Sequence, residues 1–138
     1  MSSPYQAIEK ALAFYFDGLY HSDVDLLAKV FHPNAHYVCA TEDPLMYLTM
    51  DEYFPIVNRR ESPASRGEAR QDKIVSISLA GPNTAFVTLN CAIGEKFFTD
   101  FLSLILVDGR WQIISKVFHF DLRDPATNSD RVSLPKEQ

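Results

Sequence analysis

The stretch that decides the fold runs from Phe97 to Val107 (FFTDFLSLILV), through Asp108-Gly109, and on to Arg110–Asp121 (RWQIISKVFHFD). Asp-Gly between two runs of β-prone residues is typical of a two-residue hairpin turn. With that turn Val107 pairs with Arg110, and we expect Phe98 to face His119 and Asp100 to face Val117. A three-residue loop would instead shift the register and exchange the partners on each face.

Successive side chains of a strand point to opposite faces of a sheet, so this register divides the hairpin into two faces. The first face is almost wholly apolar and contains Asp100 and His119 as its main ionisable residues. A carboxylate on an apolar face is costly unless it is paired or protonated, which makes Asp100 a candidate site residue. The alternative is an Asp–His or Asp–Tyr pair with no further role. The predicted apolar face comprises Phe98, Asp100, Leu102, Leu104, Leu106, Trp111, Ile113, Ser115, Val117 and His119.

The second predicted face mixes large aromatic side chains with polar ones. We expect the helices to leave this face uncovered, and a half-apolar open face favours a homodimer formed through the sheet. A merely solvated face is the alternative. Its predicted members are Phe97, Thr99, Phe101, Ser103, Arg110, Gln112, Ile114, Lys116, Phe118 and Phe120.

Upstream of the hairpin the chain predicts helices first and strands later. Ser3 and Gln6 form a capping box for a helix over residues 4–20, Ser22 is expected to cap a second helix, and Thr49 with Glu52 opens a third near residues 50–60. The remaining predicted strands cover residues 35–40, 45–48, 73–80 and 84–93. This order predicts one α+β domain over residues 1–122, with an antiparallel sheet and a polar tail over residues 123–138.

Composition narrows the function. The chain has 138 residues and a formal net charge of −5, which argues against nucleic acid as a partner. No apolar run approaches the roughly 20 residues of a membrane span, and no secretory signal is visible, so we expect a cytoplasmic protein with no membrane partner. Cys39 and Cys91 are expected to be buried thiols. No metal-ligand cluster or cofactor motif is apparent, so neither a metal nor a cofactor is expected.

Two further stretches, Phe14–Leu27 (FYFDGLYHSDVDLL) and Phe31–Ala35 (FHPNA), resemble the opening of NTF2-like, or SnoaL-like, domains. Val107–Ile114 (VDGRWQII) resembles their last hairpin. Within that superfamily the chain is most similar to the putative lumazine-binding group, to which Thr99-Asp100-Phe101 and Lys116–His119 correspond. The resemblance covers roughly residues 5–122 and implies a cone-shaped α+β barrel, with three helices on a strongly curved sheet, an enclosed pocket and dimers through the sheet.

The resemblance also implies a distant chemical analogy to ketosteroid isomerase. Tyr15 corresponds to the oxyanion-hole tyrosine of that enzyme, and Asp100 to its protonated aspartic acid. The position of its general base is occupied here by Cys39, so isomerase chemistry loses its first step. His119 is the only substitute that the predicted face offers.

We therefore expect a homodimeric domain that binds a small, partly aromatic or hydrophobic molecule between the helices and the sheet. One alternative is a metal-independent lyase, isomerase or hydrolase that uses Tyr15, Asp100 and His119. Another is a non-catalytic assembly module whose pocket is filled by side chains. The predicted ligand-binding residues are Tyr15, Cys39, Tyr53, Phe54, Phe98, Asp100, Trp111 and His119.

Overall fold

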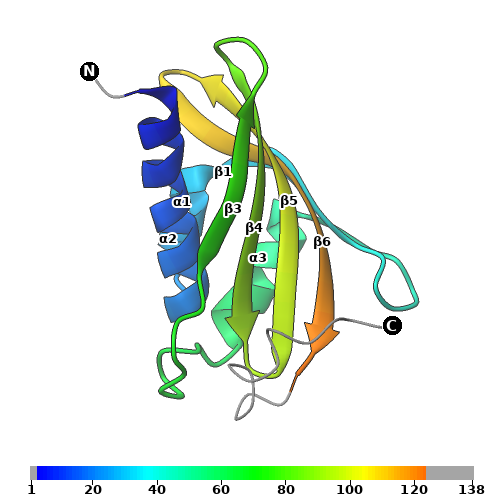
Figure 1. Ribbon diagram of the computed structural model, residues 1–138. Coiled ribbons are helices and arrows are strands. Elements are labelled where there is room, and N and C mark those ends of the chain that lie inside the picture. The colour runs from blue at the N-terminus through cyan, green and yellow to red at the C-terminus, as the bar shows by residue number, and fades with distance from the viewer. Residues whose placement is uncertain (1–2, 124–138) are drawn as a thin grey trace.

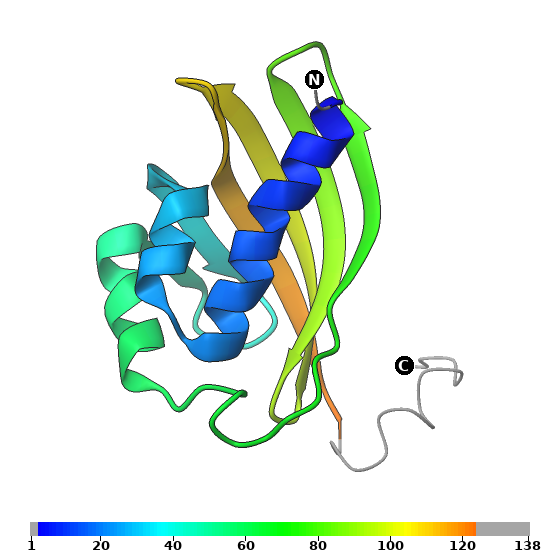
Figure 2. The same cartoon turned by 90° about the vertical axis from the view of Figure 1, so that its left-hand side faces the viewer.

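The computed structural model describes residues 3–123, in which three helices pack on one face of a six-stranded sheet (Figures 1 and 2). The helices are α1 (Pro4–His21), α2 (Val24–Val30) and α3 (Met50–Arg59). The strands are β1 (Phe31–Cys39), β2 (Met46–Thr49), β3 (Lys73–Leu79), β4 (Thr84–Ile93), β5 (Lys96–Val107) and β6 (Arg110–Leu122). The predicted tail over residues 123–138 lies outside the described residues except for Arg123. The domain boundary at residue 122 stays a prediction.

The helix starts follow local capping chemistry. The Ser3 hydroxyl accepts a hydrogen bond from the Gln6 backbone N–H, and the Gln6 side chain accepts one from the Ser3 N–H, both at 3.1 Å. The predicted cap of α2 is wrong by one residue: Asp23, whose carboxylate accepts from two backbone N–H groups, takes the place of Ser22. Ser22 instead ends α1 in the left-handed conformation, with a φ of 50°. A carboxylate suits a helix N-terminus better than a hydroxyl because it also complements the helix dipole.

The sheet is mixed and open, with strand order β2-β1-β6-β5-β4-β3. The expected fully antiparallel sheet is therefore wrong in one place, since β1 and β6 run parallel. Such a pair needs a long crossover, and here the crossover contains β2, α3 and the strands that follow. The sheet curves around α1 without closing into a barrel, and β2 and β3 are its edges (Figure 2).

The hairpin forms as predicted at its turn but not along its length. Asp108 and Gly109 both have positive φ, as a two-residue turn requires, and Leu104 pairs with Ile113 in the expected register. Ile114 then has no partner of its own, because the next pair is Ser103 with Ser115. This β-bulge exchanges the two faces of β6 from that point on. Thr99, and not Phe98, therefore pairs with His119, and Asp100 pairs with Phe118.

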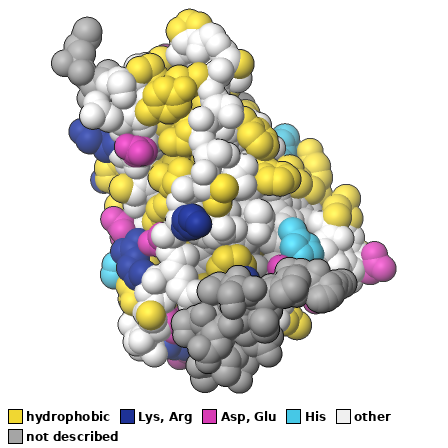
Figure 3. Space-filling model, viewed as in Figure 1, with side chains coloured by type: hydrophobic (Ala, Val, Ile, Leu, Met, Phe, Trp, Pro, Cys, Tyr) yellow, Lys and Arg dark blue, Asp and Glu magenta, His cyan; other side chains and the backbone are white. Residues whose placement is uncertain are grey.

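The bulge corrects the predicted membership of both faces. Phe118, Phe120 and Lys116 are buried on the helix side, although all three were expected on the outer face. Gln112 precedes the bulge and is buried beside the turn, where its side-chain N–H donates to the Val107 carbonyl at 3.1 Å. The outer face instead exposes hydrophobic side chains among mostly uncharged ones (Figure 3). On β3 to β6 the most exposed of these are Val75, Phe86, Phe101 and Val117.

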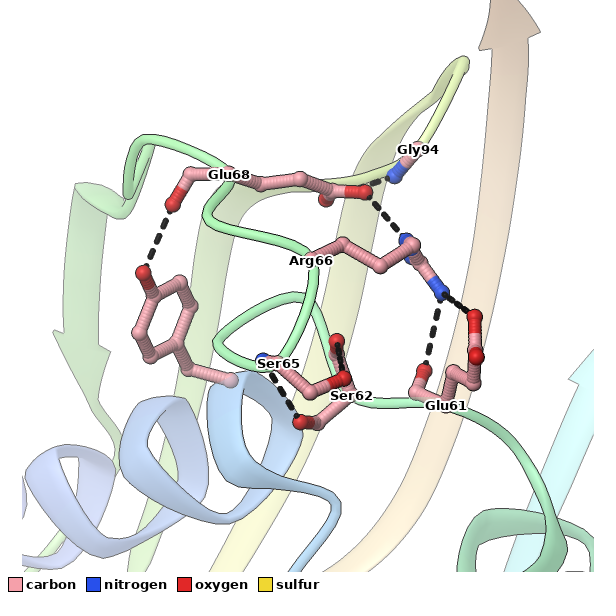
Figure 4. A network of polar contacts seen from close by, with 7 residues as sticks. Glu61, Ser62, Ser65, Arg66, Glu68 and Gly94 are labelled. Atoms are coloured by element: carbon pink, nitrogen blue, oxygen red, sulfur yellow. Dashed lines mark hydrogen bonds and ion pairs between the residues drawn. The ribbon is translucent and has the colours of Figure 1, made fainter.

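The loop between α3 and β3 is fixed by a polar network (Figure 4). Arg66 Nε lies 2.7 Å from a Glu68 carboxylate oxygen, and Arg66 Nη1 donates to the Glu61 carbonyl at 3.0 Å. The other Glu68 carboxylate oxygen accepts from the Gly94 N–H at 2.9 Å, which ties the loop to the β4–β5 turn. This network holds the β4–β5 turn against the end of α3.

Within residues 3–123, no helix combines the length and the apolar composition needed to cross a membrane. The cytoplasmic location stays a prediction.

Candidate functional site

The site is centred on Asp100, which β5 places on the helix side of the sheet. Its side chain is fully buried, and one carboxylate oxygen accepts a hydrogen bond from the Tyr15 hydroxyl. Tyr15 belongs to the apolar stripe of α1 and is itself fully buried. The structure therefore brings together the two residues that the resemblance had linked.

Lys116 completes this cluster and was missed in the sequence. The bulge at Ile114 turns Lys116 inward, where its ammonium nitrogen lies 3.8 Å from Asp100 Oδ2. The ammonium also lies 4.9–5.9 Å from the ring centres of four aromatic side chains: Tyr15, Tyr37, Tyr53 and Phe118. A buried cation is stabilised by a paired carboxylate and by the negative faces of such rings. We refer to Tyr15, Asp100 and Lys116 as the buried cluster.

The electrostatics of the buried cluster follow from burial and pairing. Burial raises the pKa of Tyr15 well above its usual value, and the negative charge of Asp100 raises it further. Burial alone would lower the pKa of Lys116, but the Asp100 carboxylate and the nearby phenol groups outweigh it and raise the pKa above the ordinary lysine value. Lys116 is therefore an ammonium and Tyr15 a neutral phenol at physiological pH.

Two polar atoms, one in the buried cluster and one beside it, have unused hydrogen-bonding capacity. Among residues 3–123, Asp100 Oδ1 and the Tyr53 hydroxyl oxygen are buried and have no hydrogen-bond partner. Tyr53 comes from α3 and stacks on Tyr37 with ring centres 4.1 Å apart. Buried polar atoms are nearly always satisfied, so an orphaned acceptor and an orphaned hydroxyl indicate a place where a water molecule or a ligand group can bind.

A pocket of about 280 Å³ opens next to the cluster, between the ends of β1, β5 and β6 and the end of α3. Tyr37 and Phe118 line this pocket and also contact the Lys116 ammonium, so the two rings separate the pocket from the buried cluster. Burial raises the pKa of Tyr37 to about 12, against the opposing effect of Lys116. The pocket is lined by Tyr37, Cys39, Met46, Arg60, Ile93, Glu95, Lys96, Phe98, Phe118 and Phe120.

The predicted site residues fall into separate groups in the structure. Cys39 and Phe98 line the pocket, while Tyr15, Tyr53 and Asp100 lie in or beside the buried cluster. The structure does not bring the other three to this place. Phe54 is half-buried against Phe31, and Trp111 is buried beside the hairpin turn opposite Leu106.

His119 lies on the other face of the sheet. Its Nδ1 is 2.9 Å from the Thr41 hydroxyl oxygen, and its Nε2 is 3.0 Å from an Asp121 carboxylate oxygen. The side chain is largely exposed. The expected proximity of His119 and Asp100 is wrong because the expected register ignores the bulge.

The arrangement differs in one chemical respect from the two-donor oxyanion site that the resemblance implied. The Lys116 ammonium lies 3.8 Å from Asp100 Oδ2, and the Tyr15 hydroxyl is used in donating to the same carboxylate oxygen. The cluster therefore offers a carboxylate that can accept a proton and an ammonium that can stabilise a developing negative charge. Cys39, at the position of the missing base, lines the pocket as a buried free thiol.

The pairing of Lys116 with Asp100 is testable by a double-mutant cycle. Lys116→Met leaves a buried carboxylate without its cation, and Asp100→Asn leaves a buried ammonium without its anion. We expect each single change to lower the free energy of unfolding by about 3–5 kcal/mol, and the double variant to lose much less than the sum. Urea denaturation measures both, with Lys10→Met on the exposed side of α1 as the control. Additive losses would contradict the ion pair.

Comparison with known proteins identifies the family of the chain. Residues 3–119 match the family model described as putative lumazine-binding. A curated relative, the aldolase FrzH from a Cladobotryum species, is 24% identical over 120 residues, which is 86% of this chain and 92% of that protein.

Solved structures share the fold. An NTF2-like protein of unknown function from Shewanella baltica OS155 superposes with a TM-score of 0.77 at 23% identity, covering 88% of this chain and 98% of its own. Another NTF2-like protein of unknown function, from Silicibacter pomeroyi DSS-3, superposes with a TM-score of 0.76 at 22% identity, covering 85% of this chain and 95% of its own. A putative scytalone dehydratase from Novosphingobium aromaticivorans DSM 12444 superposes with a TM-score of 0.64 at 17% identity, covering 86% of this chain and 84% of its own. The chain has the NTF2-like fold and belongs to the putative lumazine-binding family.

Proposed function

We propose that this domain binds a small, flat and mostly apolar molecule in the pocket at the end of α3. The observation that carries the proposal is the pocket itself, which approaches the size of ordinary ligand sites and has aromatic walls. The Phe98 ring centre on β5 lies 5.7 Å from that of Phe118 and 5.9 Å from that of Phe120, both on the adjacent β6. Such a wall suits a planar ring system better than a branched aliphatic chain.

Three observations support ligand binding over the assembly-module alternative. The pocket is not filled by side chains, although the neighbouring core is closely packed. The buried cluster behind it holds the orphaned atoms of Asp100 and Tyr53, which is costly in a purely structural core. The description of the family names lumazine as its putative ligand, and lumazine is a fused-ring heteroaromatic molecule with the flat shape that the walls favour.

Ligand binding is tested by calorimetry and thermal shift with lumazine, a flavin and a small aromatic acid. A molecule that binds the native state raises the melting temperature. For the probe that binds, we expect Phe98→Ala to weaken the affinity by about tenfold through the lost ring contact. Phe86→Ala, which removes an exposed ring from the outer face, is the matched control and leaves the affinity unchanged. Equal weakening by both variants would place the ligand elsewhere.

A second candidate function is metal-independent carbon–carbon lyase chemistry. The specific observation is the Asp100 carboxylate oxygen 3.8 Å from the ammonium of Lys116, in a relative of a protein named an aldolase. In the cleavage direction Asp100 accepts the hydroxyl proton of a β-hydroxy ketone. The carbon–carbon bond then breaks and its electron pair moves to the carbonyl oxygen, whose negative charge Lys116 stabilises. The Asp100 proton returns to the enolate carbon, which completes the exchange.

In this scheme Lys116 acts through its charge and not as an imine-forming nucleophile. Asp100 raises the pKa of Lys116, so the free amine that imine formation requires is scarce. His119 has no part in this scheme, because it pairs with Asp121 on the other face of the sheet; the base that it was expected to supply is Asp100.

The lyase candidate is tested with a fluorogenic naphthyl β-hydroxy ketone. We expect Asp100→Asn to lower the rate of cleavage by about 100-fold or more, the usual cost of losing a general base. Asp121→Asn, a carboxylate change on the outer face, is the control and keeps the rate. Borohydride reduction in the presence of substrate leaves Lys116 unmodified. Turnover that survives Asp100→Asn, or trapping of an imine at Lys116, would contradict the scheme.

We also propose that two copies associate through the outer face of the sheet. This face exposes Phe86 and Phe101, whose ring centres are 5.7 Å apart, and Val117 on the next strand. A surface whose centre is uncharged and partly apolar suits a symmetric partner.

Light scattering tests this association. We expect a particle of twice the chain mass of 15.7 kDa at micromolar concentration. Phe101→Glu shifts it toward the monomer, because a charge would be buried at the centre of the interface. Leu45→Glu, at an exposed apolar position in the β1–β2 loop, is the control. A monomer in the unmodified protein would rule out the dimer.

A further inference from the structure

We infer that the pocket selects anionic ligands, and that Arg60 binds the carboxylate of a planar aromatic acid at its mouth. This inference rests on the proposed ligand pocket and adds the charge class of the ligand and the residue that recognises it. Arg60 follows the last residue of α3, and its backbone N–H caps the helix by donating to the Val57 carbonyl at 3.3 Å. The cap fixes where the side chain leaves the helix, and from there it reaches the pocket lining.

The guanidinium of Arg60 has unused hydrogen-bonding capacity. Its Nε is buried and has no hydrogen-bond partner among residues 3–123. Arg60 also forms no ion pair with any residue in that range. Arg66 and Arg70, in the following loop, are both paired with carboxylates at 2.7–2.9 Å. Leaving a buried charged donor unpaired is costly, so the difference indicates a partner that the chain does not supply.

The local charge agrees with an anionic partner. The pocket lining contains two cationic side chains, Arg60 and Lys96, and one carboxylate, Glu95, in a chain whose net charge is −5. Lys96 is partly occupied, since its ammonium lies 4.6 Å from the Phe120 ring centre. A pocket lining with net positive charge on an acidic protein attracts anions to that place.

The shape of the pocket selects among anions. A guanidinium is planar and binds a carboxylate through two parallel N–H···O bonds, which fixes the plane of the ligand. Beyond Arg60 the lining contains four aromatic rings, that of Tyr37 on β1 and those of Phe98, Phe118 and Phe120 on β5 and β6. A carboxylate attached directly to an aromatic ring system therefore satisfies both ends of the pocket at once.

The test compares 2-naphthoate with 2-naphthamide, which has the same ring and no charge. Calorimetry on the full chain measures both affinities in wild type, Arg60→Gln, Arg60→Lys and Arg59→Gln. Arg59 is the matched control because it is the preceding residue, is exposed and does not line the pocket. We expect naphthoate to bind wild type at least about tenfold more tightly than naphthamide, as a charged hydrogen-bonded pair requires. Arg60→Gln removes that preference, Arg60→Lys keeps part of it, and Arg59→Gln keeps all of it.

Each other outcome overturns a definite part. Equal binding of the two probes by wild type, or a preference that survives Arg60→Gln, overturns the anion inference and leaves the ligand pocket standing. Failure of both probes, with lumazine and flavin also failing, overturns the pocket and with it this inference. If the urea midpoints of the Arg60 variants are unchanged, the loss of preference for naphthoate comes from binding and not from unfolding. If Arg60→Gln lowers the midpoint but keeps that preference, the result counts against the role of Arg60.

Discussion

The internal chemistry of this domain depends on one unpaired residue, Ile114, in β6. Up to Ile113 the strand follows the register set by the Asp108-Gly109 turn, and beyond Ile114 every side chain points to the opposite face. The bulge therefore brings an ammonium, and not an imidazole, to the carboxylate of Asp100. It also turns Phe118 and Phe120 inward, where they become pocket walls, and leaves Val117 on the outer face. Pocket, buried cluster and outer surface thus share one structural cause.

The cluster shows how a buried charge changes what its neighbours can do. A buried carboxylate and a buried ammonium are each costly alone and stabilise one another when they are paired. With Lys116 at 3.8 Å the pair is balanced, and the four rings around the ammonium replace part of the water it has lost. Tyr15 then serves the carboxylate and is not a free donor. The fold position that the resemblance linked to two neutral donors therefore holds a carboxylate beside a fixed positive charge.

Local signals in the sequence predicted much of the fold. The capping residues Ser3 and Gln6, the Asp108-Gly109 turn and the strand alternation each act over a few residues, and each was confirmed. The parallel pairing of β1 with β6 could not be predicted in this way, because it joins segments far apart in the sequence. The bulge did leave a trace. The large apolar residues of β6 change from odd positions, Trp111 and Ile113, to even ones, Phe118 and Phe120. Lys116 hid this change because a lysine is rarely expected inside.

The path from pocket to cluster determines which functions the domain can perform. Arg60 lies at the mouth, the aromatic walls follow, and the charges of Asp100 and Lys116 lie behind Tyr37 and Phe118. A ligand can occupy the pocket with these two rings in place, because Asp100 is fully buried and does not line it. Chemistry at Asp100 requires one ring to move, since a general base must come within hydrogen-bond reach of the proton it accepts. The difference between a binding domain and an enzyme on this scaffold therefore lies in the mobility of Tyr37 and Phe118, and not in the presence of charged groups.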